Sequence, residues 1–437
     1  MPAELSVQRE LLDYVEAHRD ALVSLVQDLV RIPSENTPPT GAEAACQRYC
    51  REYLEACGFE TDLYELSEVE GLESHPLFRP GRDYAGRPNL AAKLKGGDGL
   101  SILLSGHIDT VPRGTLPWTR DPFSGHVENG LLYGRGSNDM KAGIATNLFV
   151  ARAFHDLGIR PLGDVTIECV VDEEFGGVNG TLAGRVRGHL AHAAIISEPS
   201  FLRICHAQRG GRTAHITFES ANAGILSEHM EDGVAGQVAW FLSQVPGFAE
   251  LRRATAPPNP AYRHLANPVP VSVLKVHTGP WGSGEPMATA ATCKVELFWQ
   301  TMPGESLETV DAQFNLWFGQ VVAARPDLYP SHPNVEFPIR WLPGSTLPDH
   351  DFSRFFLQQF SGAAEEAIGT APAQAGIEGP CDMYVFHQHF GMPAILWGAR
   401  GANTHLADES VEIDSVVDAA KVLLLFVYRW GRFPSFR

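Results

Sequence analysis

The chain has 437 residues, of which 44% are hydrophobic and 20% charged, the balance of an ordinary globular protein. Acidic residues outnumber basic ones by 52 to 34, and the resulting formal net charge of -18 argues against nucleic acid or an anionic membrane as a partner. The length predicts two domains. The absence of a signal-peptide pattern and of a spanning apolar segment, together with seven scattered cysteines, predicts a cytoplasmic protein with reduced thiols.

The first half of the chain alternates helices and strands. Leucines and valines at steps of three and four residues predict an amphipathic helix over 7–32. A second helix is expected over about 41–57, closed by Gly58, and a further one over about 140–157. Strands are expected at 59–66, 89–95, 100–106, 165–171 and 193–197, with another helix between the last two. Alternation with continuous apolar strands predicts an α/β layer with a mostly parallel sheet, in which ligands bind at the carboxyl ends of the strands.

The pattern changes to α+β between about 210 and 340. The strands RTAHITFES, PVSVLKV and CKVELFWQ alternate more strongly, and helices are expected near 234–246 and 305–325. The α/β alternation then returns, with MPAILWG as a buried strand and a closing helix over 411–429. We therefore predict a catalytic domain formed by 1–209 and 342–437, with a smaller domain, 210–341, inserted into it.

The stretch LSILLSGHIDTVP, residues 100–112, ends a predicted buried strand with a histidine and an aspartate. Because side chains alternate along a strand, His107 and Asp109 point to the same side. Taken alone, this pair is typical of a capped strand end with a satisfied histidine. Its interpretation depends on whether similar residues lie at the neighbouring strand ends.

Chemically similar residues do recur at such positions. They are Asp139 in GRGSNDMKAG, Glu173 and Glu174 in VVDEEFGG, Glu198 in IISEPS and His405 in GANTHLADE. Each alone fits a helix N-cap, a solvated loop charge or a surface histidine. Their shared placement at strand carboxyl ends is hard to explain by chance, and imidazoles with carboxylates suit zinc or a related divalent ion.

The motifs SGHIDTVP, GRGSNDMKAG, DEEFGG, SEP and THLADE, in this order and spacing, resemble those of a dinuclear zinc amidohydrolase and metallopeptidase family. This family includes acetylornithine deacetylase, succinyl-diaminopimelate desuccinylase, aminoacylase and carboxypeptidase G. The resemblance runs from about residue 20 to the C-terminus. It implies a zinc-peptidase-like catalytic domain with an inserted lid that also forms a homodimer or a higher homo-oligomer.

The resemblance also implies a set of metal ligands. His107 would bind one metal, and Asp139 would bridge two metals through its two carboxylate oxygens. Glu174 and His405 would complete the coordination of one metal, and Glu198 that of the other. The expected cofactor is one or two divalent ions per chain, zinc first, with manganese or cobalt as alternatives.

Two further residues would act beside these ligands. Asp109 would accept the other ring N–H of His107 and fix its tautomer. Glu173 would be the general base that takes a proton from metal-activated water and hands it to the leaving nitrogen. The family also carries a cis peptide after the bridging aspartate, here between Asp139 and Met140.

The sequence departs from the family in the inserted domain. Where relatives place a histidine that stabilises the oxyanion, the aligned position holds Gly224, and His229 lies five residues later. His229 is either a displaced equivalent of that histidine or a surface residue, and the sequence leaves both open.

Two other departures concern the arginines with which relatives bind an α-carboxylate. Gln300 and Thr301 stand before the Pro-Gly where one arginine is usual, and Tyr384 replaces the other, two residues after the matching Asp382. Substrate-binding candidates are found instead in HAQRGGR, namely His206, Arg209 and Arg212, for which an interdomain salt bridge is the competing explanation.

The predicted activity is metal-dependent hydrolysis of a C–N bond, of the deacylase or amidohydrolase type, on a small substrate that is atypical for the family. Two enzymatic alternatives are hydrolytic deamination of an electron-poor aromatic amine such as a nitroanthranilate, and deformylation of a formamide. A fourth hypothesis, from another class, is an inactive metal-containing binding protein. The presence of Glu173 beside a full ligand set argues against it.

Overall fold

The structure is a computed structural model, and it describes residues 2–220, 233–279 and 288–434. The chain forms two compact units. The larger unit consists of Met1–His206, Thr346–Ile377 and Cys381–Arg437, and the smaller of Ala207–Ser345 and Glu378–Pro380. The units therefore divide a few residues away from the predicted boundaries.

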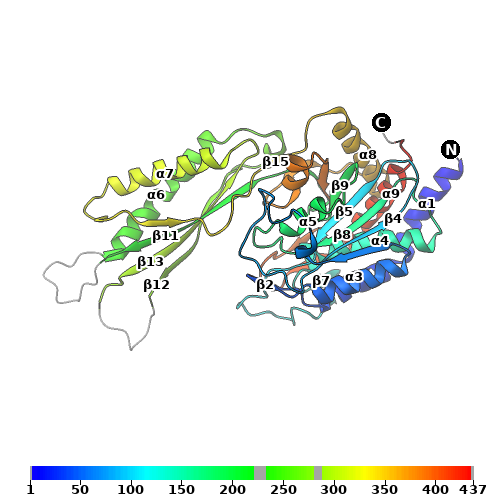
Figure 1. Ribbon diagram of the computed structural model, residues 1–437, viewed down its shortest axis with the longest axis horizontal. Coiled ribbons are helices and arrows are strands. Elements are labelled where there is room, and N and C mark those ends of the chain that lie inside the picture. Colours follow the sequence, from blue (N-terminus) through cyan, green and yellow to red (C-terminus); the bar gives the residue numbers. More distant parts are fainter. Residues whose placement is uncertain (1, 221–232, 280–287, 435–437) are drawn as a thin grey trace. The chain divides into compact units, whose positions relative to one another are not determined.

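A nine-stranded sheet forms the centre of the larger unit, in the order β15-β10-β17-β9-β5-β8-β4-β3, with β16 paired to β10 (Figure 1). β17, β9, β5 and β8 run parallel to one another, whereas β10 pairs antiparallel with β17, β4 with β8, and β3 with β4. The α/β class is confirmed, and the sheet is mixed, with its parallel part at the centre. The strands are β3 (Glu60–Tyr64), β4 (Asn89–Leu94), β5 (Ile102–His107), β8 (Val165–Val170), β9 (Ala193–Ile196), β10 (Ile204–Gln208), β15 (Ser345–Thr346), β16 (Gln374–Ile377) and β17 (Ala394–Leu396).

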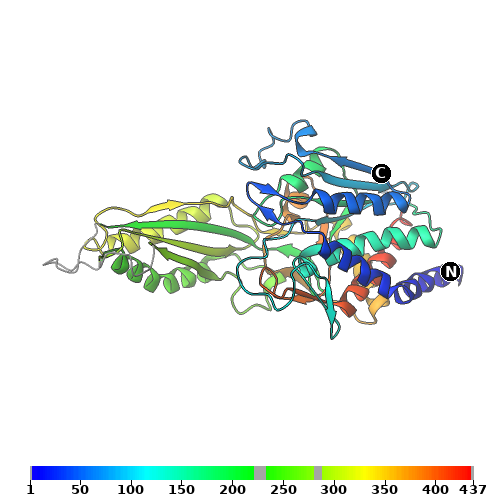
Figure 2. The same cartoon turned by 90° about the horizontal axis from the view of Figure 1, so that it is seen from below.

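Helices pack on this sheet and on one another. Figure 2 shows α1 and α2 in dark blue beside α4 in teal and α9 in red, and contacts join α4 to α2, α9 and β5. The helix predicted over 7–32 is interrupted at His18, whose backbone leaves the helical region. The helices are α1 (Pro2–Ala17), α2 (Arg19–Arg31), α3 (Ala44–Ala56), α4 (Ala142–Asp156), α5 (Asn179–Val186), α8 (Asp351–Ile368) and α9 (Ile413–Trp430). Among the described residues, none of the helices combines the length and apolarity needed to cross a bilayer.

A small antiparallel sheet, in the order β18-β19-β7-β6, joins distant parts of the sequence. Its strands are β6 (His126–Glu128), β7 (Leu131–Tyr133), β18 (Gly401–Ala402) and β19 (Ser410–Glu412). The pairing of β19 with β7 brings the segment around His405 next to the segment that leads to Asp139. A two-stranded pair, β1 (Asn36–Thr37) and β2 (Thr40–Gly41), lies apart from it in the chain.

The smaller unit has the predicted α+β composition. Its antiparallel sheet has the order β12-β13-β11-β14, and α6 packs on it and against α7 (Figure 1). The core between these layers is aromatic, with Phe241, Phe248, Trp299 and Phe314 buried. The elements are β11 (Gly210–Glu219), α6 (Gly233–Thr255), β12 (Val271–Thr278), β13 (Thr292–Thr301), α7 (Leu307–Ala323) and β14 (Asn334–Glu336).

Candidate active site

Three neighbouring parallel strands of the large sheet deliver polar side chains to one edge. β5 ends at His107, the Glu173–Glu174 pair follows β8, and Glu198 follows β9. β5 pairs in parallel with both β8 and β9, so their carboxyl ends meet at the same edge. The sheet topology therefore explains why residues far apart in sequence converge.

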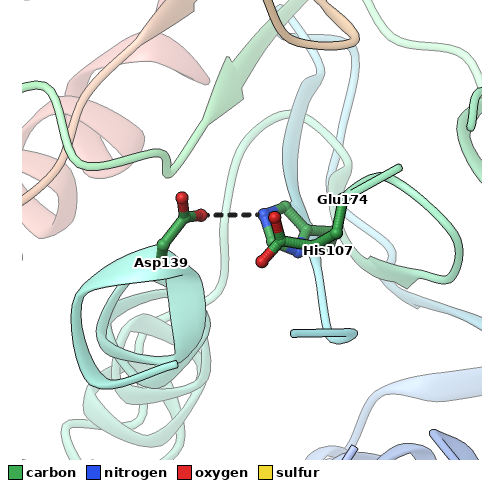
Figure 3. A group of neighbouring side chains, drawn as sticks. All are labelled: His107, Asp139 and Glu174. Atoms are coloured by element: carbon green, nitrogen blue, oxygen red, sulfur yellow. Dashed lines mark hydrogen bonds and ion pairs between the residues drawn. The ribbon is translucent and has the colours of Figure 1, made fainter. Parts of the chain in front are cut away.

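Asp139 lies between the two histidines of the cluster. Its Oδ1 is 3.0 Å from His107 Nε2, and its Oδ2 is 3.3 Å from His405 Nε2. Glu198 Oε1 lies 3.5 Å from His107 Nε2, and Glu174 Oε2 lies 2.9 Å from His405 Nε2. Figure 3 shows His107, Asp139 and Glu174 directed toward one space. Each histidine is thus paired with one oxygen of Asp139 and with one glutamate.

The donor set fits a divalent cation. Ligand atoms of His107, Asp139 and Glu174 lie within 4.8 Å of one another, as do those of His107, Glu173 and Glu198. Imidazole nitrogens and carboxylate oxygens are the donors that zinc and related ions prefer. Four carboxylates accompany two histidines here, so a cation would offset the excess of negative charge.

Burial and the neighbouring groups of opposite charge have opposing effects on the pKa values of the glutamates and of His405. Burial raises the pKa of Glu174 to about 7, with the Asp139 charge adding to the effect and His405 opposing it. Burial also raises the pKa of Glu173 well above its usual range, against the attraction of His107. Burial disfavours the charge on His405, but Glu174 and Asp139 outweigh it and raise the pKa of the imidazole to about 11.

Asp109 is arranged differently from the expectation. Its backbone carbonyl, 2.9 Å from His107 Nδ1, accepts the ring N–H, whereas its carboxylate lies 3.7 Å from that nitrogen. The carboxylate instead accepts the backbone N–H of Glu173 at 3.1 Å and of Glu174 at 3.2 Å, and the amide of Asn36 at 2.9 Å. Asp109 therefore fixes the His107 tautomer through its main chain and holds the glutamate loop through its side chain.

The loop that carries Asp139 is held by Glu409, to which the sequence analysis assigned no role. The Glu409 carboxylate is 1% exposed and accepts the backbone N–H of Gly136, Asn138 and Asp139 at 2.9–3.0 Å, and Arg135 Nη1 at 2.6 Å. The Asp139–Met140 peptide is cis. Glu409 follows His405 by four residues, in the quoted motif THLADE, so its place beside a predicted ligand was the available signal.

The arginines predicted to bind substrate are engaged within the smaller unit. Arg209 donates to the backbone carbonyls of Glu378 and Pro268, at 2.8 and 2.7 Å. Arg212 forms a bidentate ion pair with Asp311, at 2.8 and 2.6 Å. Arg212 therefore forms a salt bridge, but both partners lie in the same unit, so the expected interdomain pairing is wrong.

The remaining predicted residues are placed as follows. His206 lies half-buried on β10 in the larger unit, and burial lowers the pKa of its imidazole. Asp382 is buried, and burial raises the pKa of its carboxyl to about 7. Gly224 and His229 lie outside the described residues.

Comparison with known proteins decides the family. The model of peptidase family M20/M25/M40 matches residues 103–429, the range that contains every residue of the cluster. The chain belongs to this family. It is therefore a hydrolase, and its M20 relatives act on amide C–N bonds, as the motifs predicted.

Individual relatives sharpen this placement. The chain is 27% identical to the N-formyl-4-amino-5-aminomethyl-2-methylpyrimidine deformylase of Halalkalibacterium halodurans, over 98% of each chain. It is 25% identical to the deformylase of the same name from Bacillus subtilis, over 95% of this chain and 96% of the relative. Human carnosine dipeptidase 1 shares the fold, with a TM-score of 0.71 at 16% identity over 98% of this chain and 100% of that one. The M20 catalytic-plus-lid architecture is thereby confirmed.

Proposed function

We propose that this M20 hydrolase removes the formyl group from an N-formylated amine, with a formylated aminomethylpyrimidine as the first substrate to test. The observation that carries the proposal is Glu173 beside the cluster of His107, Asp139, Glu174, Glu198 and His405. The two deformylases that align over nearly the whole chain point to the formamide.

The smaller unit favours a formamide over an N-acyl amino acid. Arg209 and Arg212, the candidates for an α-carboxylate, are engaged by carbonyl oxygens and by Asp311. A formylated aminomethylpyrimidine has no carboxylate beside its amide, so its binding does not require these arginines. The departures at Gln300 and Tyr384 agree with the same substrate class.

His107, Asp139, Glu174, Glu198 and His405 would hold one or two divalent ions, which we propose to be zinc. Such an ion supplies Lewis acidity, which polarises a carbonyl and makes water more acidic. His107 presents Nε2 to the site because Nδ1–H donates to the Asp109 carbonyl. Glu409 keeps the Asp139 backbone in place by accepting its N–H.

Glu173 moves the protons of the reaction. As a carboxylate it takes a proton from the attacking water while the water oxygen forms a bond to the formyl carbon. The C–N bond then breaks, and Glu173 returns the proton to the nitrogen, which leaves as the free amine together with formate. Burial raises the pKa of this carboxyl, which makes Glu173 a stronger proton acceptor than an exposed glutamate.

The substrate assay compares three classes of compound. The purified enzyme is incubated with N-formyl-aminomethylpyrimidine, with N-acetyl amino acids and with nitro-substituted aminobenzoates, and formate, acetate and ammonia are measured. We expect formate release with a kcat/KM at least a hundredfold above that for the other two. Faster acetate release would establish a general deacylase, and ammonia from the aminobenzoates would establish the deaminase; either result contradicts the proposal.

We further propose that the smaller unit forms a homodimer through β12. This strand is an edge of its sheet, and Val273, Leu274 and Val276 are 37%, 51% and 51% exposed. Exposed apolar edge strands are ready surfaces for strand pairing. Light scattering should give a dimer for the wild type, a monomer for Val276→Lys, and a dimer for the control Leu316→Lys, on the exposed side of α7. A monomeric wild type at micromolar concentration contradicts the proposal.

A cytoplasmic location remains our proposal for the compartment. All seven cysteines lie within the described residues, are buried and are not joined in disulfides, which agrees with a reducing environment. Thiol titration of the denatured, unreduced protein should find seven reactive thiols, and a disulfide would contradict this proposal.

A further inference from the structure

The loop between β8 and α5 carries both Glu173 and Glu174 and contains no regular helix or strand. The direction of the Glu173 side chain therefore depends on the groups that hold the loop backbone. Asp109 holds one side, since its carboxylate accepts the N–H groups of both glutamates. The carbonyl groups of the loop need partners of their own.

Two arginines from the preceding part of the chain donate to those carbonyls. Arg79 Nη1 lies 3.0 Å from the Phe175 oxygen and 3.1 Å from the Gly176 oxygen. Arg82 Nη2 lies 3.2 Å from the same Phe175 oxygen. The loop N–H groups are thus held by the carboxylate of Asp109, and its carbonyl oxygens by the guanidinium groups of Arg79 and Arg82.

The residue before Glu173 is anchored by the same segment. Asp172 is fully buried with a positive φ of 63°, and its Oδ2 accepts the hydroxyl of Tyr84 at 2.6 Å. Arg82 Nε lies 3.4 Å from the same oxygen. Tyr84 also accepts the amide of Asn179 at 2.8 Å, at the start of α5. Both ends of the loop are therefore tied to Tyr84.

The two ends of the turn that carries the glutamates lie close together. A Cβ on Gly177 would lie 1.5 Å from the Asp172 oxygen, so the two ends of the turn are in direct contact. The Glu174 carboxylate has further partners in the Val111 N–H at 3.1 Å and in His405. The Glu174 carboxylate is therefore held by its own side-chain contacts, whereas the direction of the Glu173 side chain depends more on how the loop backbone is held.

We propose that the segment 79–84, acting through Arg79, Arg82 and Tyr84, is a positioning element that sets the direction of Glu173. The inference rests on the proposed role of Glu173 as the general base. Each of the three residues contacts the loop backbone or Asp172. They act through the backbone of the loop and through Asp172.

The test uses Tyr84→Phe, which removes one hydroxyl and retains the ring. Tyr14→Phe is the matched control, because Tyr14, like Tyr84, donates its hydroxyl to an aspartate, here Asp156 at 2.7 Å, outside the site. For Tyr84→Phe in the zinc-loaded enzyme we expect kcat to fall about ten- to a hundredfold, with KM and bound metal unchanged. Tyr14→Phe should keep the wild-type kcat. Arg79→Met should behave like Tyr84→Phe, and Arg79→Lys should recover part of the loss.

A double-mutant cycle separates positioning from a general loss of structure. If the segment acts through Glu173, adding Tyr84→Phe to Glu173→Gln lowers the residual kcat no further. Additive losses, or equal kcat values for Tyr84→Phe and Tyr14→Phe, overturn the inference. Glu173→Gln alone reports on the proposed base: if it keeps wild-type kcat, both that role and the positioning of it are wrong, whatever Tyr84→Phe does.

Discussion

Two groups of buried charges in this protein differ in whether the chain itself neutralises them. In the smaller unit, Arg212 is paired with Asp311 and Arg209 donates to backbone carbonyls. At the edge of the large sheet, Asp139 and three glutamates lie around two imidazoles, those of His107 and His405. The first group is complete within the chain, whereas the second has an excess of negative charge.

This difference teaches how to separate structural charges from functional ones. Burial does not distinguish them, since Glu168 and Glu409 are each 1% exposed and each is paired with an arginine. The distinguishing property is the balance of charge among the nearest partners. A buried carboxylate cluster without matching cations is suited to a metal, and one base beside it is suited to proton transfer.

The largest expected effect is at the proposed base. Glu173→Gln keeps the size of the side chain and removes the proton acceptor, so kcat should fall at least about a hundredfold while bound metal is unchanged. Glu168→Gln is the control, because Glu168 is buried and paired with Arg185 and Ser105. Steady-state kinetics on folded protein should show wild-type kcat for the control. A Glu173→Gln enzyme with near wild-type kcat contradicts the assignment.

A variant of Glu409 tests whether a carboxylate that is paired with an arginine, Arg135, still supports metal binding at the cluster. In Glu409→Gln one oxygen becomes an amide group that donates rather than accepts, so the backbone N–H groups around Asp139 lose partners. We expect metal affinity to fall about ten- to a hundredfold, measured by competition with a chelating dye. Glu168→Gln should keep the wild-type affinity. Equal affinities for the two variants would show that the Asp139 loop does not need Glu409.

Arg212 tests the opposite group. Arg212→Met leaves Asp311 without its bidentate partner, so the free energy of unfolding should fall by about 3 kcal/mol. Chemical denaturation measures this loss, and KM of the remaining folded enzyme should stay within about twofold. A variant with wild-type stability and a greatly raised KM would instead show that Arg212 binds the substrate.

The smallest expected effect is on the pH dependence of stability, and it comes from the buried imidazole of His387. Burial lowers the pKa of His387 to about 4, against its bond to the Ala394 carbonyl. The unfolded chain binds a proton below about pH 6.5 and the folded one does not, so stability falls on acidification through that window. Between pH 7 and pH 5 the wild type should lose about 2 kcal/mol more than His387→Gln. Parallel losses would show that His387 does not titrate on unfolding.

Much of the fold is predictable because its signals are local. The apolar strands around 102–107 and 165–170 and the helix over 142–156 lie close to where periodicity places them. The small sheet β18-β19-β7-β6 was missed because its strands are two or three residues long and pair across the sequence. The helix α8 was missed although its phenylalanines follow a helical period and Gly369 ends it with a positive φ.

The site was predictable in its residues and less so in its contacts. His107, Asp139, Glu174, Glu198 and His405 lie at strand ends or loops that the motifs already marked. The contacts that hold the ligands in place depend on tertiary structure. The Asp109 side chain accepts backbone N–H groups of the glutamate loop, and the Glu409 side chain accepts the N–H of Asp139, 270 residues earlier. The motif THLADE marks Glu409 as a neighbour of His405, but sequence spacing does not show which loop its side chain contacts.

Counting the bound ions tests the central claim, that the uncompensated carboxylates hold a divalent metal, most directly. Elemental analysis after dialysis should find one to two ions per wild-type chain, and Asp139→Asn, which removes a charge facing both His107 and His405, should lose at least one of them. Fewer than about one ion per wild-type chain, with hydrolysis indifferent to a chelator, would contradict the account.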